Sequence, residues 1–124
     1  MSKLLLVEDD QVLADLYRTR FEADGFVVVR AEDGEQALEL ASAEKPDIIL
    51  LDIMIPKLDG FAVLEQLKKN KALHKIPVII TSNLGQPEDM ARGKALGAVD
   101  YFVKADQTPN QMSERVKEIL KHKS

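Results

Sequence analysis

The sequence contains no cysteine, only two histidines, and no hydrophobic run that approaches the length of a membrane-spanning helix. The absence of cysteine excludes disulfide bonds and thiolate-bound metals, and it is compatible with a reducing compartment. The absence of a long apolar run argues against a membrane partner. Because strand-like sequence follows Met1 almost at once, we expect no signal peptide and predict a cytoplasmic protein.

Positive charge is not concentrated in one part of the sequence, as it would be in a nucleic-acid-binding surface. The chain has 17 lysine and arginine residues against 21 aspartate and glutamate residues, and the basic residues are scattered along it. This distribution argues against nucleic acid as a direct ligand. With 124 residues, 45% of them hydrophobic, the chain is long enough for one buried core. We therefore predict a single domain over residues 1–124, with no output domain inside the chain.

The hydrophobic residues alternate between two patterns. Short continuous apolar runs are typical of strands that are buried on both faces of a parallel sheet. Five such runs occur, at residues 4–7, 26–29, 48–51, 78–80 and 101–103. Turn-forming residues, mainly glycine and proline, separate these runs from stretches with helical spacing.

Each apolar run is followed by residues that would share one face of a helix. Asp10 and Thr108, the latter followed by Pro109, fit the N-cap positions of the first and last helices. Five strand–helix units predict the α/β class, with a single doubly wound parallel sheet and helices on both faces. The predicted helix faces are Leu13, Leu16, Tyr17 and Phe21; Ala37, Leu38 and Ala41; Phe61, Leu64 and Leu67; Met90, Ala91 and Ala95; and Met112, Val116, Ile119 and Leu120.

We single out the polar residues that follow the first, third, fourth and fifth apolar runs. The carboxyl ends of parallel strands meet at one edge of the sheet, which is the usual ligand site of such folds. This edge would collect three acids after the first run, one acid after the third, two hydroxyls after the fourth and one ammonium after the fifth: Glu8, Asp9, Asp10, Asp52, Thr81, Ser82 and Lys104.

Taken singly, each of these residues has an ordinary structural explanation. An acid after a strand often caps the next helix, as we expect of Asp10, and Lys104 could simply be solvated. Together, however, several carboxylates at one edge repel one another unless a cation lies among them. Oxygen ligands without histidine or cysteine favour a hard divalent ion, and Mg²⁺ suits a site that also binds phosphate.

The sequence resembles the receiver domain of two-component response regulators, such as the chemotaxis regulators, over essentially its whole length. The resemblance implies a flavodoxin-like fold with five parallel strands in the order 2-1-3-4-5. It rests on motifs in matching order and spacing: LLLVEDD at 4–10, DGEQAL at 33–38, PDIILLD at 46–52, IMIP at 53–56, DG at 59–60, PVIITS at 77–82 and GAVDYFVK at 97–104.

The resemblance also implies a role for each residue at the carboxyl edge. Asp52 matches the phosphoryl acceptor of the family, and Glu8 and Asp9 match its acidic pair. These three carboxylates, together with the backbone carbonyl of Met54, would hold Mg²⁺. Lys104 would neutralise a phosphoryl oxygen.

Two further residues match the family's switch positions. Ser82 matches the switch hydroxyl by its distance from the preceding proline, whereas Thr81 would point into the sheet. Tyr101 occupies the aromatic position. A phosphoryl group on Asp52 would draw Ser82 towards it and let Tyr101 turn inward. The change would be read out on the face formed by the fourth helix, at about 87–96, the last strand and the last helix.

The family also implies partners for the chain. The phosphoryl donor would be the phosphohistidine of a sensor histidine kinase or a phosphotransfer protein, and the output would be a separate target protein or a fused domain. The chain would be a monomer or a phosphorylation-dependent dimer, and a phosphoacceptor rather than a turnover enzyme. Met54 and Leu84 would flank the path of the hydrolytic water; both are bulky and apolar, so we expect slow loss of the phosphoryl group.

Other functions use a similar fold or a similar aspartate. A haloacid-dehalogenase-type phosphatase needs a second aspartate two residues after the first, where this chain has Met54. A flavodoxin-like cofactor carrier needs a phosphate-binding loop after the first strand, where this chain has three acids that would repel a phosphate without a bridging metal ion. A degenerate receiver that serves as a scaffold would not need the full set of Glu8, Asp9, Asp52, Ser82 and Lys104.

Overall fold

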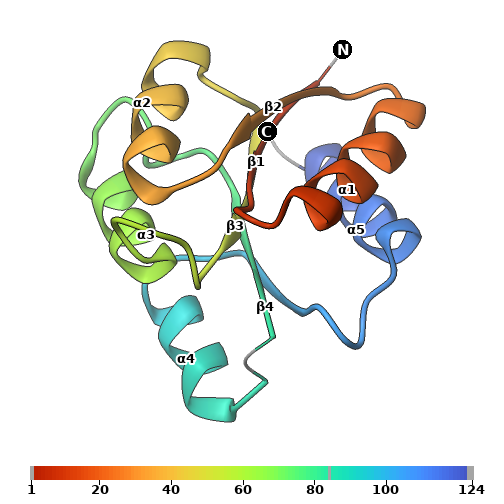
Figure 1. Ribbon diagram of the computed structural model, residues 1–124. Coiled ribbons are helices and arrows are strands. Elements are labelled where there is room, and N and C mark those ends of the chain that lie inside the picture. The colour runs from red at the N-terminus through yellow and green to blue at the C-terminus, as the bar shows by residue number, and fades with distance from the viewer. Residues whose placement is uncertain (1, 84, 123–124) are drawn as a thin grey trace.

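The computed structural model describes residues 2–83 and 85–122, in which strands and helices alternate along the chain (Figure 1). The predicted alternation is therefore confirmed. Within the described ranges, no helix is both long enough and apolar enough to cross a membrane. The elements are β1 (Lys3–Val7), α1 (Gln11–Ala23), β2 (Val27–Ala31), α2 (Gly34–Glu44), β3 (Ile48–Asp52), α3 (Gly60–Lys69), β4 (Val78–Ser82), α4 (Pro87–Ala95), β5 (Asp100–Val103) and α5 (Pro109–Lys121).

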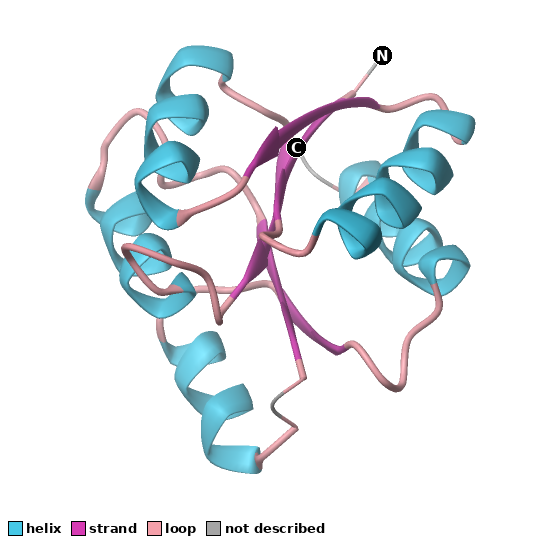
Figure 2. Cartoon of the chain, viewed as in Figure 1, coloured by secondary structure: helices cyan, strands magenta, loops and turns pink. Residues whose placement is uncertain are grey.

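The strands form one parallel sheet in the order β2-β1-β3-β4-β5. Figures 1 and 2 show α2, α3 and α4 on one face of the sheet and α1 and α5 on the other. This confirms the predicted doubly wound, flavodoxin-like fold. The strand order changes direction between β1 and β3, and the carboxyl ends at such a point are where open α/β sheets bind ligands.

Each face of the sheet is covered by its own hydrophobic layer. Neighbouring residues of a strand point to opposite faces, so both must be apolar when both faces are buried. Leu5, Val7, Ile49, Leu51 and Ile80 pack towards α2 and α3, while Leu4, Leu6, Ile48, Leu50 and Ile79 pack towards α1 and α5. Every residue of β3 is buried, including Asp52 at its end.

The second strand begins later than its apolar run at residues 26–29 predicts. β2 spans Val27–Ala31 because it pairs in register with the whole of β1. Phe26 lies before the strand, where its N–H donates to the carbonyl of Phe21 at 3.0 Å and its ring packs edge-on against the ring of Phe21. The later end of the strand places Arg30 inside it.

The predicted apolar face of the fourth helix is wrong. Met90, Ala91 and Ala95 are exposed, and α4 instead approaches the sheet at the buried Gly93. A Cβ atom at Gly93 would lie 2.6 Å from Cδ1 of Ile80. A side chain at residue 93 would therefore require the end of the Ile80 side chain to move.

The other predicted helix faces are confirmed with one exception. On α1, Leu16 is 50% exposed, and Ala14 is buried in its place beside Tyr17 and Phe21. The remaining residues predicted to face the core from α1, α2, α3 and α5 are buried or partly buried.

Side chains cap the first and last helices as predicted. Oδ1 of Asp10 accepts the N–H of Leu13 at 3.0 Å. Thr108 and Gln111 form a reciprocal capping box, with Pro109 in the first turn of α5. The carboxylate of Asp10 is therefore already used by the backbone of α1.

Asp24, the residue after α1, joins that helix to α5. Its carboxylate accepts hydrogen bonds from Arg20 and from the buried hydroxyl of Ser113, and Nζ of Lys117 lies 3.5 Å away. The hydrogen bonds from Arg20 and then Ser113 lower the pKa of Asp24 from its ordinary value of 3.8 to about 2. The ionised form of Asp24 thus stabilises the packing of α5 on α1.

We expect Asp24→Asn to lower the free energy of unfolding at neutral pH, and the difference from the wild type to shrink in acid. A carboxyl with a lower pKa in the folded chain stabilises it above the unfolded-state value, and this contribution is lost as the pH falls from 3.8 through about 2. Urea unfolding over this pH range measures the difference. Glu22→Gln, at an exposed acid near the end of α1, serves as the control. A difference that stays constant with pH would contradict the assignment.

Candidate functional site

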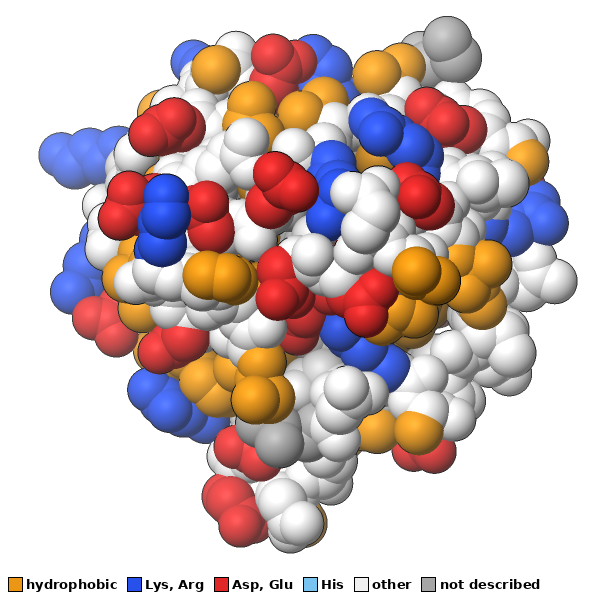
Figure 3. All heavy atoms as spheres, in the orientation of Figure 1, with side chains coloured by type: hydrophobic (Ala, Val, Ile, Leu, Met, Phe, Trp, Pro, Cys, Tyr) orange, Lys and Arg blue, Asp and Glu red, His pale blue; other side chains and the backbone are white. Residues whose placement is uncertain are grey.

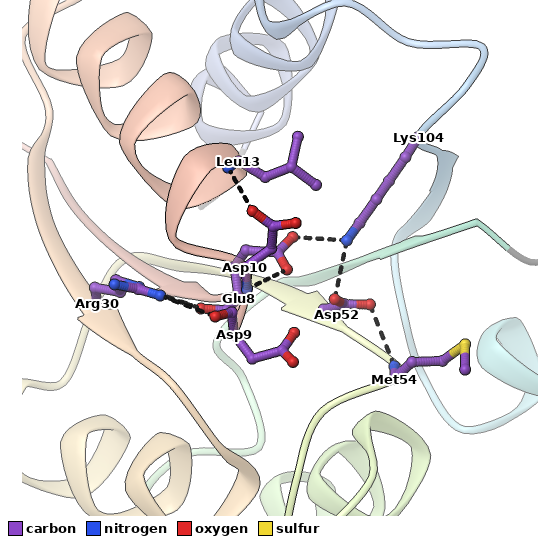
Figure 4. A network of polar contacts seen from close by, with 8 residues as sticks. All are labelled: Glu8, Asp9, Asp10, Leu13, Arg30, Asp52, Met54 and Lys104. Atoms are coloured by element: carbon purple, nitrogen blue, oxygen red, sulfur yellow. Dashed lines mark hydrogen bonds and ion pairs between the residues drawn. The ribbon is translucent and has the colours of Figure 1, made fainter.

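Four of the predicted site residues meet at the carboxyl edge of the sheet (Figure 4). Glu8 and Asp9 follow β1, Asp52 ends β3, and Lys104 follows β5. One carboxylate oxygen from each of the three acids lies within 4.8 Å of those of the other two. Figure 3 shows acidic side chains gathered at the centre of this face of the molecule.

Lys104 lies between two of the three carboxylates. Its Nζ donates to Oε1 of Glu8 at 2.6 Å and to Oδ2 of Asp52 at 2.9 Å, and all three side chains are nearly buried. Burial alone would lower the pKa of Lys104, but the hydrogen bonds to Glu8 and Asp52 outweigh burial and raise it. The ammonium therefore remains charged and offsets part of the negative charge.

The surroundings of Glu8 also shift its pKa. Burial raises the pKa of Glu8 to about 7, and the carboxylate of Asp52 adds to the increase, while the hydrogen bond from Lys104 opposes it. The N–H of Asp10 also donates to Oε2 of Glu8 at 3.2 Å. Lys104 alone does not neutralise the cluster, and a bound cation would favour the ionised form of Glu8.

The backbone around Asp52 holds its side chain in place. Oδ1 of Asp52 accepts the N–H of Met54 at 3.2 Å. Behind it, α3 begins so close that a Cβ atom at Gly60 would lie 2.4 Å from the carbonyl oxygen of Asp52. The N–H of Gly60 donates to the carbonyl of Ile53 at 2.8 Å. The absence of a side chain at residue 60 thus lets α3 pack directly against the end of β3.

The two aspartates after β1 have different surroundings. Asp10 caps α1, as described above. Asp9 is exposed, it belongs to the cluster of three carboxylates, and among residues 2–83 and 85–122 no donor is recorded for its carboxylate. The separation of roles that the sequence predicted, with Asp9 at the site and Asp10 at the helix, agrees with these contacts.

Ser82 and Tyr101 form a second pair next to the carboxylates. Ser82 ends β4 and is completely buried, and its side chain is hydrogen-bonded to the hydroxyl of Tyr101 on β5. Burial raises the pKa of that hydroxyl. Thr81, the alternative hydroxyl, is also buried and pairs with Asp52 in the register of β3 and β4.

The positions proposed to flank the hydrolytic water are only partly described. Met54 is 63% exposed, and Figure 4 shows its side chain leading away from the carboxylate of Asp52 while its N–H faces it. Leu84 lies outside the described residues.

One residue of the site was missed by the sequence analysis. Arg30 of β2 donates to the carbonyl oxygens of Glu8 and Asp9, and its side chain is 12% exposed. A signal was present: Arg30 is the charged residue in the otherwise apolar segment VVVRA. A cation inside a strand of a covered sheet needs nearby acceptors, and these are the backbone carbonyls that follow β1.

The chemistry of this edge follows from its donor atoms. Glu8, Asp9 and Asp52 supply carboxylate oxygens that a metal ion could share. The set contains oxygen and no nitrogen or sulfur, so its residues fit a hard divalent cation. A carboxylate can also act as a nucleophile, and Lys104 provides a fixed positive charge beside Asp52.

Comparison with known proteins gives one consistent family. A model of the response regulator receiver domain matches residues 4–117. The alkaline phosphatase synthesis transcriptional regulatory protein PhoP of Bacillus subtilis is 40% identical over 119 residues, which are 96% of this chain and 48% of PhoP. The DNA-binding dual master transcriptional regulator RpaA of Synechocystis is 36% identical over 98% of this chain and 50% of RpaA. This chain spans about half the length of these curated relatives.

Solved structures agree with the sequence relatives. The receiver domain of the Francisella response regulator 1452 superimposes with a TM-score of 0.93 at 33% identity, and each chain is covered completely. The chemotaxis response regulator CheY4 of Vibrio cholerae superimposes with a TM-score of 0.89 at 25% identity, over 96% of this chain and 98% of CheY4.

Proposed function

Because the chain belongs to the response regulator receiver domain family, whose role is that of a phosphorylation-activated switch, we propose that Asp52 carries its phosphoryl group. The observation that carries this proposal is the position of Asp52. It is a buried carboxylate at the end of the central strand, 2.9 Å from the ammonium of Lys104 and within 4.8 Å of two further carboxylates.

The phosphoryl donor is a phosphohistidine of a sensor histidine kinase or of a phosphotransfer protein. A carboxylate oxygen of Asp52 attacks the phosphorus, so that a P–O bond forms while the P–N bond breaks. The electron pair of the broken bond stays on the imidazole, which then takes up a proton. Such transfers depend mainly on positioning and on neutralising the phosphoryl oxygens, which Lys104 does from beside Asp52.

Mg²⁺ is the cofactor that suits this set of donors. Glu8, Asp9, Asp52 and the backbone carbonyl of Met54 would hold it. When bound, it supplies further positive charge next to the phosphoryl oxygens. Lys104, which bridges Glu8 and Asp52 in the structure, is then available to bind a phosphoryl oxygen.

The hydrogen bond between Ser82 and Tyr101 connects the surroundings of Asp52 to the surface of β5. Ser82 exchanges Tyr101 for a phosphoryl oxygen, and Tyr101 changes its position on β5. Tyr101 also lines a shallow hollow of about 270 Å³ between α4 and β5, together with Met90, Lys94, Ala98, Val99 and Asp100. A change at Tyr101 thereby alters the face of α4, β5 and α5, which binds a target protein or mediates a dimer.

The chain acts as one cytoplasmic receiver domain over residues 1–124 and not as a turnover enzyme. Its output lies in a fused domain or in a separate protein.

Labelling with acetyl phosphate tests the function. We expect the wild-type chain to acquire a phosphoryl group in the presence of Mg²⁺ and to stay unlabelled when the metal is chelated. Intact-protein mass spectrometry and release of inorganic phosphate are followed together. A switch becomes labelled, a phosphatase releases phosphate continuously, and a cofactor carrier or scaffold does neither; the last two outcomes would overturn the proposal.

We expect Met54→Asn to shorten the lifetime of the phosphoryl group by about two- to tenfold. The amide of asparagine can orient a water by a hydrogen bond, whereas the thioether of methionine does so poorly, and one hydrogen bond contributes roughly 0.5–1.5 kcal/mol. The lifetime is measured by mass spectrometry after the donor is removed. Met90→Asn, at another exposed methionine, is the matched control. An unchanged lifetime in Met54→Asn would show that residue 54 does not guard the path of the water.

A further inference from the structure

We propose that Arg30 is a positioning residue that fixes the two carboxylates following β1 in their metal-binding orientation, an inference that rests on the metal site proposed above. The guanidinium reaches from β2 to the loop after β1. Its Nε and Nη2 donate to the carbonyl oxygen of Glu8 at 3.1 and 3.0 Å, and Nη2 also donates to the carbonyl oxygen of Asp9 at 3.3 Å.

These contacts determine the direction of two successive peptide groups. Both carbonyls point towards Arg30 on β2, and the N–H of Glu8 donates to the carbonyl of Ala31 at 3.0 Å. Figure 4 shows the guanidinium on one side of the Glu8–Asp9 backbone and the carboxylate of Asp52 on the other. With the backbone held from the β2 side, the carboxylates of Glu8 and Asp9 are directed to the cluster with Asp52.

Two further side chains hold the guanidinium in place. Its Nη1 donates to Oε1 of Gln11 at 2.7 Å and lies 3.7 Å from Oε1 of Glu32. A planar guanidinium can satisfy neighbouring acceptors in one fixed arrangement, which the single ammonium of lysine cannot do. Arg30 is therefore matched to the two carbonyls and to Gln11 at the same time.

The direction of the change in metal affinity distinguishes a positioning role of Arg30 from a purely electrostatic one. A positive charge next to a cation site repels the cation, so removing it would tighten metal binding if charge were its main contribution. If Arg30 acts by positioning, its removal should weaken metal binding, because loss of the guanidinium frees the two peptide groups. Groups that orient metal ligands typically contribute about 10- to 100-fold to metal affinity.

The test is the Mg²⁺ affinity of the whole chain, measured by isothermal titration calorimetry. We expect Arg30→Met, which keeps the length of the side chain without its donors, to bind Mg²⁺ about 10-fold more weakly than the wild type. Arg30→Lys, which keeps the charge and one donor group, should recover part of this loss. Arg18→Met is the matched control, because Arg18, like Arg30, donates to a backbone carbonyl, in its case that of Val28 in β2, but it lies on α1 and not beside the loop after β1.

Labelling with acetyl phosphate gives a second readout. In Arg30→Met the Mg²⁺ concentration for half-maximal labelling should rise, and the rate at saturating Mg²⁺ should approach that of the wild type. If Arg30→Met fails to fold, Gln11→Ala removes only the outer support of the guanidinium and should show a smaller loss of affinity. Unchanged or tighter Mg²⁺ binding in the folded variant would overturn the role of Arg30. Failure of the wild type to bind Mg²⁺ would instead overturn the metal site itself.

Discussion

Asp52→Asn is expected to take up no phosphoryl group from acetyl phosphate and Mg²⁺, under conditions in which the wild type becomes labelled. The amide has the shape of the carboxylate and can still accept the N–H of Met54, so the loop after β3 should keep its conformation. It lacks the anionic oxygen that attacks phosphorus. The loss should therefore be complete and not graded, and intact-protein mass spectrometry detects it directly.

The control for this experiment is Asp59→Asn. Asp59 is an exposed aspartate in the same loop, and its carboxylate caps α3 through the N–H of Ala62 at 3.0 Å. Asparagine caps helices about as well as aspartate, so this variant should fold and label normally. Labelling of Asp52→Asn to the level of the wild type would mean that another side chain is the acceptor, and peptide mapping would locate it.

Asp9→Asn is expected to weaken Mg²⁺ binding more than about 10-fold, whereas Asp10→Asn should leave it nearly unchanged. Asp9 contributes an oxygen to the cluster with Glu8 and Asp52, so its replacement removes a charged ligand. The loss of Mg²⁺ affinity should be at least as large as that caused by replacing a residue that only orients a ligand. The carboxylate of Asp10 is bound to the N–H of Leu13, and asparagine preserves that cap. Isothermal titration calorimetry measures the Mg²⁺ affinity of the two variants and of the wild type.

The role of Asp10 can be tested separately by its stability effect. Asp10→Ala removes the cap and should lower the free energy of unfolding by roughly 1 kcal/mol, measured by urea unfolding without metal. If Asp10→Asn lost more Mg²⁺ affinity than Asp9→Asn, the assignment of the acidic pair would be displaced by one residue.

Much of the fold could be predicted because its signals are local in the chain. The apolar run at residues 48–51 is continuous since a covered parallel strand buries both of its faces, and Asp52 at its end must then lie at the carboxyl edge. The same reasoning placed Glu8, Asp9 and Lys104 at that edge. Connections in α/β units leave few alternative arrangements, so five strand–helix units already defined the class of the fold.

The errors occurred where packing, and not periodicity, decides what is buried. Met90, Ala91 and Ala95 have the spacing of a core-facing stripe, yet they are exposed. Close approach of α4 to β4 selects Gly93 for the contact, because a Cβ atom there would overlap Ile80. A helical repeat shows that one face is apolar, but it does not reveal how near the neighbouring strand lies.

The sequence alone thus determined the order of the elements, the class of the fold and the set of charged residues at the strand ends, since each depends on residues close together in the chain. Only the tertiary structure decided how those residues meet. Lys104 bridges Glu8 and Asp52 across separations of 96 and 52 residues, and Arg30 holds the carbonyl of Glu8 from 22 residues away. Such contacts depend on the order of the strands in the sheet and on the reach of single side chains. The pattern of residues within one segment reveals neither the strand order nor these contacts, because both arise when distant segments pack together.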